Sequence, residues 1–484
     1  MTDQQTQARH TKQAPPASGP ARDVRFPPIV RTTLPNGLEI NTVEQHDLPL
    51  VAIRLVIKSG DSADPANMPG MASLVGQMLK EGTRTRSSAQ IAEDVEFLGA
   101  DLDVGSDTET TALVMRALSE HLERALGIMA DVATNPAFSD VELRKLKRRE
   151  LDRLALQQQD PGFLGTREFY RVVYGPHPYA HIDTTVDVVN RVRRQDLAAF
   201  HRTHFLPNNA FLVVVGDVTP AAVQQAAEHA LGSWRRGTVQ EPSYPTPPER
   251  TAREVIVVDR PDSVQSMISI GNLAIPRSSP DYVPLMVANQ VLGGSAASRL
   301  FMDLRERRSL TYGAYSGVGE FVQVAPFRAR ASVRNEVTAA AMDAFMEHLQ
   351  RIVTEAPPAS ELADAERYLS DSFPLRIDTA GKIAGLVSDL RMFGLPDDYW
   401  ETFRTQIRAT TADQALAAAR RHVDPEHALI VVVGKAADVV DVLRRWGPVT
   451  VLDTDGHLVR RVDSAPATPP AAAPAAATPT PAAQ

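Results

Sequence analysis

The chain has 484 residues, of which 43% are hydrophobic and 23% are charged, a balance that is typical of globular proteins and unlike disordered or collagenous ones. Its formal net charge of −8 argues against nucleic acid as a partner, since such binding needs a basic surface, and its lack of cysteine excludes disulfides and thiolate zinc sites. The longest apolar runs, such as residues 210–215, have the length of a strand, whereas a membrane-spanning helix needs about 20 apolar residues.

The chain begins with a polar segment, residues 1–28, that is rich in proline, glutamine and arginine, and we expect it to be disordered. It contains no apolar stretch that resembles the core of a signal peptide. The expected location is therefore cytoplasmic, or periplasmic if an export signal has been removed from the N-terminus.

A strand followed by a helix is then predicted twice along the chain. The alternating stretch Leu50–Lys58 predicts a strand, and a helix is predicted over Gly70–Glu81. Further on, Ser266–Ile275 and Tyr282–Leu292 repeat this order.

The ends of the two halves are also similar. Residues 196–216 align without a gap with residues 414–434, and each segment predicts a helix, a proline-marked turn and a buried strand that ends in Val-Val-Val-Gly. A helix rich in alanine and valine follows each strand. The simplest explanation is duplication of one α+β unit, and hairpin-like strand pairs favour, in each half, an antiparallel sheet with helices packed on one face.

A proline-rich segment separates the two halves. Residues 237–250 contain four prolines within seven residues, which excludes a helix or a central strand and predicts an extended linker. We therefore expect an N-terminal half over 29–236 and a C-terminal half over 251–452. Residues 453–484 end in a run of alanine, proline and threonine, and are expected to form a disordered tail.

Several motifs follow one another along the chain. They are Leu34–Leu38, Pro69–Thr83, Gly175–Tyr179, and Ser298–Arg305 with Tyr312 after it. Together they resemble those of the pitrilysin/insulinase-type zinc peptidases, which include the mitochondrial processing peptidase and the core proteins of the respiratory bc1 complex. The resemblance extends from about Arg31 to about Val449, and it implies one half of a clamshell of processing-peptidase type.

Active members of that family carry H-x-x-E-H on their first long helix, where two histidines bind Zn²⁺ and the glutamate is the base for the metal-bound water. In this chain the motif falls on Ser73, Gly76 and Gln77, and the third ligand, a downstream glutamate, falls on Arg153. Serine and glutamine are poor zinc ligands, glycine offers no base, and arginine repels a cation. A register error would nominate Glu150 or Asp152 instead, but neither restores the histidine pair.

No other catalytic motif replaces the missing one. His201 with His204 and His177 with His181 have spacings compatible with a metal site, but are interpreted as surface or capping histidines. The sequence has no G-x-S-x-G elbow, phosphate loop or dinucleotide fingerprint. Gly293-Gly294-Ser295 is interpreted as a flexible turn between helices. The long glycine-rich loop of the mitochondrial non-catalytic subunit is not matched beyond it, and no mitochondrial role follows.

Arg305 and Tyr312 match a pair that, in the resembling enzymes, reaches into the zinc site of the opposite half. There the arginine and tyrosine hold the substrate backbone and stabilise the oxyanion. A guanidinium and a phenol are suited to this role, because both donate hydrogen bonds to a developing negative charge. The alternative is that Arg305 is one of several basic residues on a solvated helix end and Tyr312 is a core aromatic.

The resemblance therefore implies a non-catalytic, substrate-binding subunit that binds no metal itself. Its partner would be an H-x-x-E-H peptidase subunit of similar size that carries the zinc, and its substrates would be peptides or unfolded polypeptides. Two alternatives stay open. One is a scaffold protein like the respiratory core proteins, and the other is a free-standing enzyme with an unrecognised site.

Overall fold

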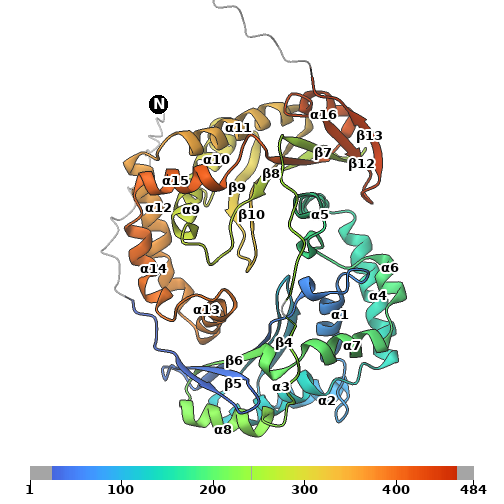
Figure 1. The fold of residues 1–484 in the computed structure, drawn as a ribbon, viewed down its shortest axis with the longest axis vertical. Helices are drawn as coiled ribbons and strands as arrows, with labels where there is room; N and C mark the ends of the chain where they lie inside the picture. Colours follow the sequence, from blue (N-terminus) through green and yellow to red (C-terminus); the bar gives the residue numbers. More distant parts are fainter. Residues whose placement is uncertain (1–23, 241, 466–484) are drawn as a thin grey trace, which may run out of the picture.

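The computed structural model describes residues 24–240 and 242–465 and divides them into two halves (Figure 1). The first half contains a six-stranded sheet, and the second a seven-stranded sheet. The strands of the first are β1 (Val30–Thr33), β2 (Glu39–Glu44), β3 (Leu50–Ile57), β4 (Asp101–Ser106), β5 (Thr111–Leu118) and β6 (Ala210–Gly216). Those of the second are β7 (Glu254–Asp259), β8 (Gln265–Leu273), β9 (Thr311–Val318), β10 (Pro326–Arg334), β11 (Leu429–Gly434), β12 (Val449–Leu452) and β13 (Leu458–Val462).

Helices fill the sequence between the strands in both halves. The first half contains α1 (Met71–Leu79), α2 (Ser88–Phe97), α3 (Leu122–Thr134), α4 (Asp140–Gln157), α5 (Pro161–Tyr174), α6 (Val186–Arg191), α7 (Arg194–His204) and α8 (Pro220–Leu231). The second contains α9 (Tyr282–Leu292), α10 (Arg299–Phe301), α11 (Thr338–Thr354), α12 (Ala359–Asp371), α13 (Ala380–Met392), α14 (Tyr399–Arg408), α15 (Ala412–His422) and α16 (Ala436–Leu443).

The strand order of the two sheets confirms the duplication. The first sheet contains the order β2-β6-β3-β5-β4, and the second contains the same order as β7-β11-β8-β10-β9. The sheets are mainly antiparallel, but β2 with β6 and β7 with β11 pair in parallel, as do β7 and β12. The β2/β6 and β7/β11 pairs depart from the antiparallel expectation, because the strand after each proline-marked turn returns over a long crossover to lie parallel to β2 or β7.

One helix of each half packs against the sheet of the other half. Helix α5 contacts β8 and β11 of the second sheet, and α13 contacts β3 and β6 of the first. Figure 1 shows α5 beneath the second sheet and α13 beside the first. Each sheet is therefore covered on both faces, whereas the sequence predicts helices on one face only. This exchange ties the two halves together.

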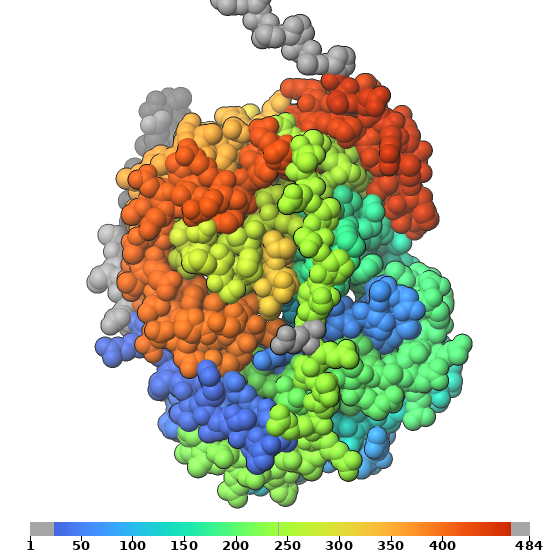
Figure 2. Space-filling model, in the orientation of Figure 1, coloured from blue at the N-terminus to red at the C-terminus, as the bar shows by residue number. Residues whose placement is uncertain are grey.

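The structure agrees with the sequence on the linker and differs from it at the two ends of the chain. Residues 237–250, apart from residue 241, which the structure does not describe, form no helix or strand, and the linker crosses the face seen in Figure 2 from one half to the other. The disordered segments were predicted too long, because Phe26 is buried in the core and β13 pairs with β12 at the sheet edge. The rest of both segments, 1–23 and 466–484, lies outside the described residues. Among the described helices, none has the length and apolar character needed to cross a membrane.

Candidate functional site

Helix α1 carries the positions that the sequence assigns to the zinc motif, and a half-buried aspartate fixes where the helix begins. Asp64 accepts hydrogen bonds from the backbone N–H groups of Gly70, Met71 and Ala72 at 2.5, 3.0 and 2.8 Å. These are groups that the first turn of a helix leaves unsatisfied. Gly70 has a φ of 82°, which glycine adopts more easily than other residues. The first turn of α1 is therefore held in one orientation against β4.

The structure brings three of the four motif positions into one cavity. Ser73, Gln77 and Arg153 line a cavity of about 470 Å³ between α1, α4 and the end of β4. Asp61 and Asp183 line it as well. The register that assigns the third ligand position to Arg153 is therefore compatible with the geometry.

Ser73 stands where the family has its first histidine, and it is bound to a carboxylate. Its hydroxyl donates to Asp61 Oδ1 at 3.0 Å. Burial raises the pKa of Asp61 to about 6, although the hydrogen bond from Ser73 works in the opposite direction. This serine and aspartate therefore satisfy each other.

Gly76 stands where the family has its general base, and the space beside it is occupied. A Cβ atom at this position would lie 2.9 Å from the hydroxyl of Ser106. That hydroxyl is held at 3.1 Å from the Ala72 carbonyl and at 2.9 Å from the hydroxyl of Thr111. A glutamate side chain at position 76 would have to displace Ser106.

Arg153, to which the sequence assigns the position of the family's third zinc ligand, binds two carboxylates. Its guanidinium donates to both oxygens of Asp183, at 2.6 and 2.7 Å, and to Glu150 at 2.8 Å. These ion pairs raise the pKa of Arg153 above its ordinary value. Glu150 is buried in this arrangement, and Asp152, the other residue that a register error would nominate, is exposed.

These side chains do not fit a zinc ion. A cation in the cavity would meet a hydroxyl already donated to Asp61, the Gln77 amide and the positive charge of Arg153, whereas protein zinc sites use histidine, cysteine or free carboxylates. Within 24–240 and 242–465, the only group of three potential ligands of this type is Asp453, Asp455 and His457, on the exposed turn before β13.

Arg305 and Tyr312 form a contacting pair on the other half. Arg305 belongs to a π-helical turn, Met302–Arg307, a kind of turn that is frequent at functional sites. Its guanidinium carbon lies 4.8 Å from the centre of the Tyr312 ring and 4.9 Å from that of Phe301. Tyr312 is 86% exposed, so the alternative that it is a core aromatic is wrong. Neither residue lines the cavity that contains Ser73.

The two histidine pairs form no metal site in the structure. His201 Nε2 donates to the Ala133 carbonyl at 2.8 Å, and burial lowers the pKa of this histidine to about 4. His204 packs on Phe200. His177 is buried, and its Nδ1 accepts from the backbone N–H of Tyr179, which caps the short helix that leads to His181.

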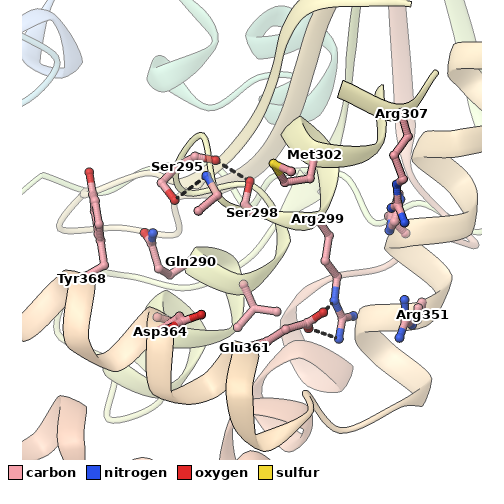
Figure 3. A pocket seen from close by; sticks show the side chains of 14 residues that line it. Gln290, Ser295, Ser298, Arg299, Met302, Arg307, Arg351, Glu361, Asp364 and Tyr368 are labelled. Atoms are coloured by element: carbon pink, nitrogen blue, oxygen red, sulfur yellow. Dashed lines mark hydrogen bonds and ion pairs between the residues drawn. The ribbon is translucent and has the colours of Figure 1, made fainter. Parts of the chain in front are cut away.

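A second cavity, of about 370 Å³, lies beside the turn that contains Gly293-Gly294-Ser295 (Figure 3). Its arginines each have a carboxylate partner. Arg299 pairs with Glu361 at 2.7 Å. Arg307 pairs with Asp303 at 3.2 Å, and Arg351 pairs with Glu355 at 2.8 Å. The guanidinium charges at this cavity are therefore balanced within the chain.

Sequence reasoning missed the acidic residues in and near the first cavity. Asp64 lies six residues before Gly70, the N-cap of α1, so it is not at the position where a capping residue is expected. Asp61 and Asp183 had no sequence signal either, since their roles depend on which residues they meet in the fold.

Comparison with known proteins identifies the family in both halves. Residues 40–163 match the model of the insulinase family (peptidase family M16), and residues 191–369 match that of the peptidase M16 inactive domain. Similar proteins include the non-peptidase homolog YmxG of Helicobacter pylori, which is 25% identical over 75% of this chain and 84% of its own. An uncharacterized zinc protease of Mycobacterium tuberculosis is 26% identical over 81% of this chain and 90% of its own.

Solved structures agree with this result. The crystal structure of a peptidase M16 inactive domain from Pseudomonas fluorescens has a TM-score of 0.80 and 29% identity, and the match covers 84% of this chain and 98% of that one. A protease structure from Helicobacter pylori shares the fold, with a TM-score of 0.79 at 18% identity. The chain belongs to the insulinase (M16) peptidase family, as an inactive homologue whose sequence contains no H-x-x-E-H motif.

Proposed function

We propose that this chain is the non-catalytic, substrate-binding and activating subunit of a heterodimeric zinc metallopeptidase. The observation that carries the proposal is the contrast between its two halves. The residues at the predicted zinc-site positions do not bind or use zinc; they are Ser73, Gly76, Gln77 and Arg153. Arg305 and Tyr312, in contrast, can donate hydrogen bonds to an oxyanion, and they lie together at an edge of the second sheet where Tyr312 is exposed. Zinc would then be bound by a partner of similar size that carries H-x-x-E-H, and not by this chain.

In this proposal, Arg305 and Tyr312 act on a peptide bound in the partner's site. The Tyr312 hydroxyl donates a hydrogen bond to the oxygen of the scissile carbonyl as negative charge develops there. The Arg305 guanidinium packs on the Tyr312 ring at 4.8 Å, fixes its direction and adds positive charge beside the oxyanion. Tyr312 is exposed, whereas Arg305 is half-buried and has one carboxylate neighbour, Glu306, at 3.3 Å. Because Glu306 lies at the surface, this contact can be exchanged for a substrate at little cost.

The proposed substrates are peptides or unfolded segments. β4 is the edge strand of the first sheet, so its outer side offers backbone groups to which an extended peptide can add. Ser106, at the end of β4, lines the cavity beside Ser73 and Gln77. A peptide that pairs with β4 would therefore run into this cavity.

An affinity pull-down followed by a titration tests the proposal. The tagged chain should recover a stoichiometric partner of similar size with an intact H-x-x-E-H motif. Adding this chain to the purified partner should raise its rate of peptide cleavage until the two are equimolar. A partner whose rate does not change on addition of this chain would refute the activating role and leave a scaffold role.

A further inference from the structure

One wall of the space between the halves carries two arginines on the same face of a strand. Arg328 and Arg330 are two residues apart on β10, so both point to the same side of the sheet. The registers place Gly317 and Tyr315 of β9 directly beside them. Arg328 donates to the hydroxyl of Thr166 at 3.0 Å, which shows that this side faces α5.

The two arginines have no negative partner. Throughout the described ranges, 24–240 and 242–465, no carboxylate oxygen lies within 4.0 Å of either guanidinium, and no carboxylate lines the cavity of about 200 Å³ that both arginines border. The cavity of about 710 Å³ that Arg330 also borders has one carboxylate in its lining, that of Asp160. Burial lowers the pKa of Arg328, and the charge of Arg330 lowers it further. Two like charges beside each other without a counterion are unfavourable, and a bound anion would relieve this cost.

This wall differs from the second cavity, where charges are matched. In Figure 3, Arg299 bonds to Glu361 within the view, and the two other arginines there pair with carboxylates of their own helical segments. The excess positive charge is therefore a property of the wall formed by Arg328 and Arg330, and not of every cavity in this half.

Three cavities connect this wall to the degenerate zinc site. The cavity that contains Ser73 shares Thr166 and Ile182 with a cavity of about 710 Å³ along α5, and that cavity shares Tyr315 and Arg330 with the cavity at the two arginines. A Cβ atom at Gly317, the neighbour of Arg328 on β9, would meet nothing within 4 Å, so the space next to this arginine is open. An extended peptide in this groove can reach both ends.

We propose that Arg328 and Arg330 form a subsite for a glutamate or aspartate side chain of a peptide held along α5. The inference rests on the proposed function, because it names the class of substrate that the same groove selects. Arg328 would bind the carboxylate from the protected side, beside Tyr170, and Arg330 from the exposed side, beside Tyr315. Hydrogen bonds to charged groups are strong enough that removing one should weaken binding about tenfold or more.

Fluorescence anisotropy with the full chain alone tests the subsite. The probes are labelled peptides of about ten residues with one host sequence, each with a single glutamate at a different position, and their glutamine counterparts. At one position the glutamate peptide should bind about tenfold more tightly than its glutamine counterpart. R330Q should abolish this preference, and R328Q should do the same. R445Q, just after α16, removes the same charge from an exposed ion pair with Asp343 and should leave the preference unchanged.

Equal affinity for glutamate and glutamine peptides at every position would overturn the subsite, as would a preference that survives in the R328Q/R330Q double variant. R330Q changes an exposed side chain, so it tests the subsite even if R328Q disturbs the packing against α5. Because the assay needs no partner subunit, it separates the two proposals. A glutamate preference in a chain that activates no peptidase would refute the proposed function and support the subsite.

Discussion

The guanidinium of Arg153 binds Asp183 through two parallel hydrogen bonds, of 2.6 and 2.7 Å, at the position where zinc peptidases of this family have a ligand. This ion pair joins α4 to the loop before α6. The same guanidinium also pairs with the buried Glu150, so one positive charge faces two carboxylates.

Arg153→Gln should destabilise the protein at neutral pH. The variant leaves Glu150 and Asp183 without their cation, and breaking a largely buried pair costs about 2 kcal/mol when part of the arginine is still exposed to solvent. Urea unfolding at pH 7 measures this loss.

Arg149→Gln is the matched control for this variant, since Arg149 lies on the same helix and pairs with Glu81 at the surface. We expect it to change the free energy of unfolding by about 0.5 kcal/mol or less. Equal effects of the two substitutions would show that the Arg153 network has no special weight.

Gly76→Ala should destabilise the protein, although alanine is favoured over glycine in helices. The new Cβ atom would lie 2.9 Å from Ser106 Oγ, and overpacking of this kind costs about 1–3 kcal/mol, which exceeds the gain in helix propensity. The penalty should be smaller in a Ser106→Ala background. A double-mutant cycle measured by urea unfolding gives this coupling.

Gly127→Ala on α3 provides the control, because a Cβ atom there would meet nothing within 4 Å. It should be neutral or stabilising by up to about 1 kcal/mol. If Gly76→Ala behaves like Gly127→Ala, the space beside α1 is free and a glutamate base could be accommodated there.

His201 should make stability depend on pH in mildly acidic solution. Burial lowers its pKa from 6.5 to about 4, so the unfolded chain binds more protons than the native one between these values. Stability is therefore fully present above pH 6.5 and is lost as the pH falls towards 4, by up to about 3 kcal/mol. Unfolding of wild type and His201→Gln at several pH values tests this.

Glutamine can still donate to the Ala133 carbonyl but does not titrate, so His201→Gln should remove this part of the pH dependence. The exposed His229→Gln, on α8, should leave it intact. An unchanged pH dependence in His201→Gln would assign the effect to other groups.

The two halves should stay associated after the linker is cut. Helix α5 packs on the second sheet and α13 on the first, and Arg391 joins Glu39 at 3.1 Å across the halves. A protease site inserted after Thr238, where the linker is exposed, should yield two fragments that coelute in size-exclusion chromatography and separate only in denaturant. Separation in plain buffer would contradict the exchanged arrangement.

The duplicated fold could be predicted because its signals are local. The helix Tyr282–Leu292 was located to the residue, and the strands around Leu50–Ile57 and Gln265–Leu273 to within two residues, since hydrophobic periodicity marks them directly. The exchange of α5 and α13 could not be predicted. An amphipathic pattern shows that a helix has a buried face, but it does not show which sheet covers that face.

The motif spacing predicts that the zinc-site positions fall on Ser73, Gly76, Gln77 and Arg153, and Ser73, Gln77 and Arg153 line one cavity in the structure. Their new partners follow no motif, because Asp61 lies 12 residues before Ser73 and Asp183 lies 30 residues after Arg153, and only the fold brings them together. In the same way, the spacing of Arg305 and Tyr312 identified the pair, while its exposure could be known only from the structure.

The turnover of the heterodimer with Tyr312→Phe tests the central claim most directly. Phenylalanine keeps the ring that stacks with Arg305 and removes only the hydroxyl, and loss of one oxyanion donor typically lowers kcat by about 100-fold. The account predicts this fall in kcat with an unchanged affinity between the subunits. Tyr368, another exposed tyrosine, lies on α12, and Tyr368→Phe should leave kcat unchanged. A kcat equal to wild type in Tyr312→Phe would contradict the account, because this chain would then contribute no group to the reaction.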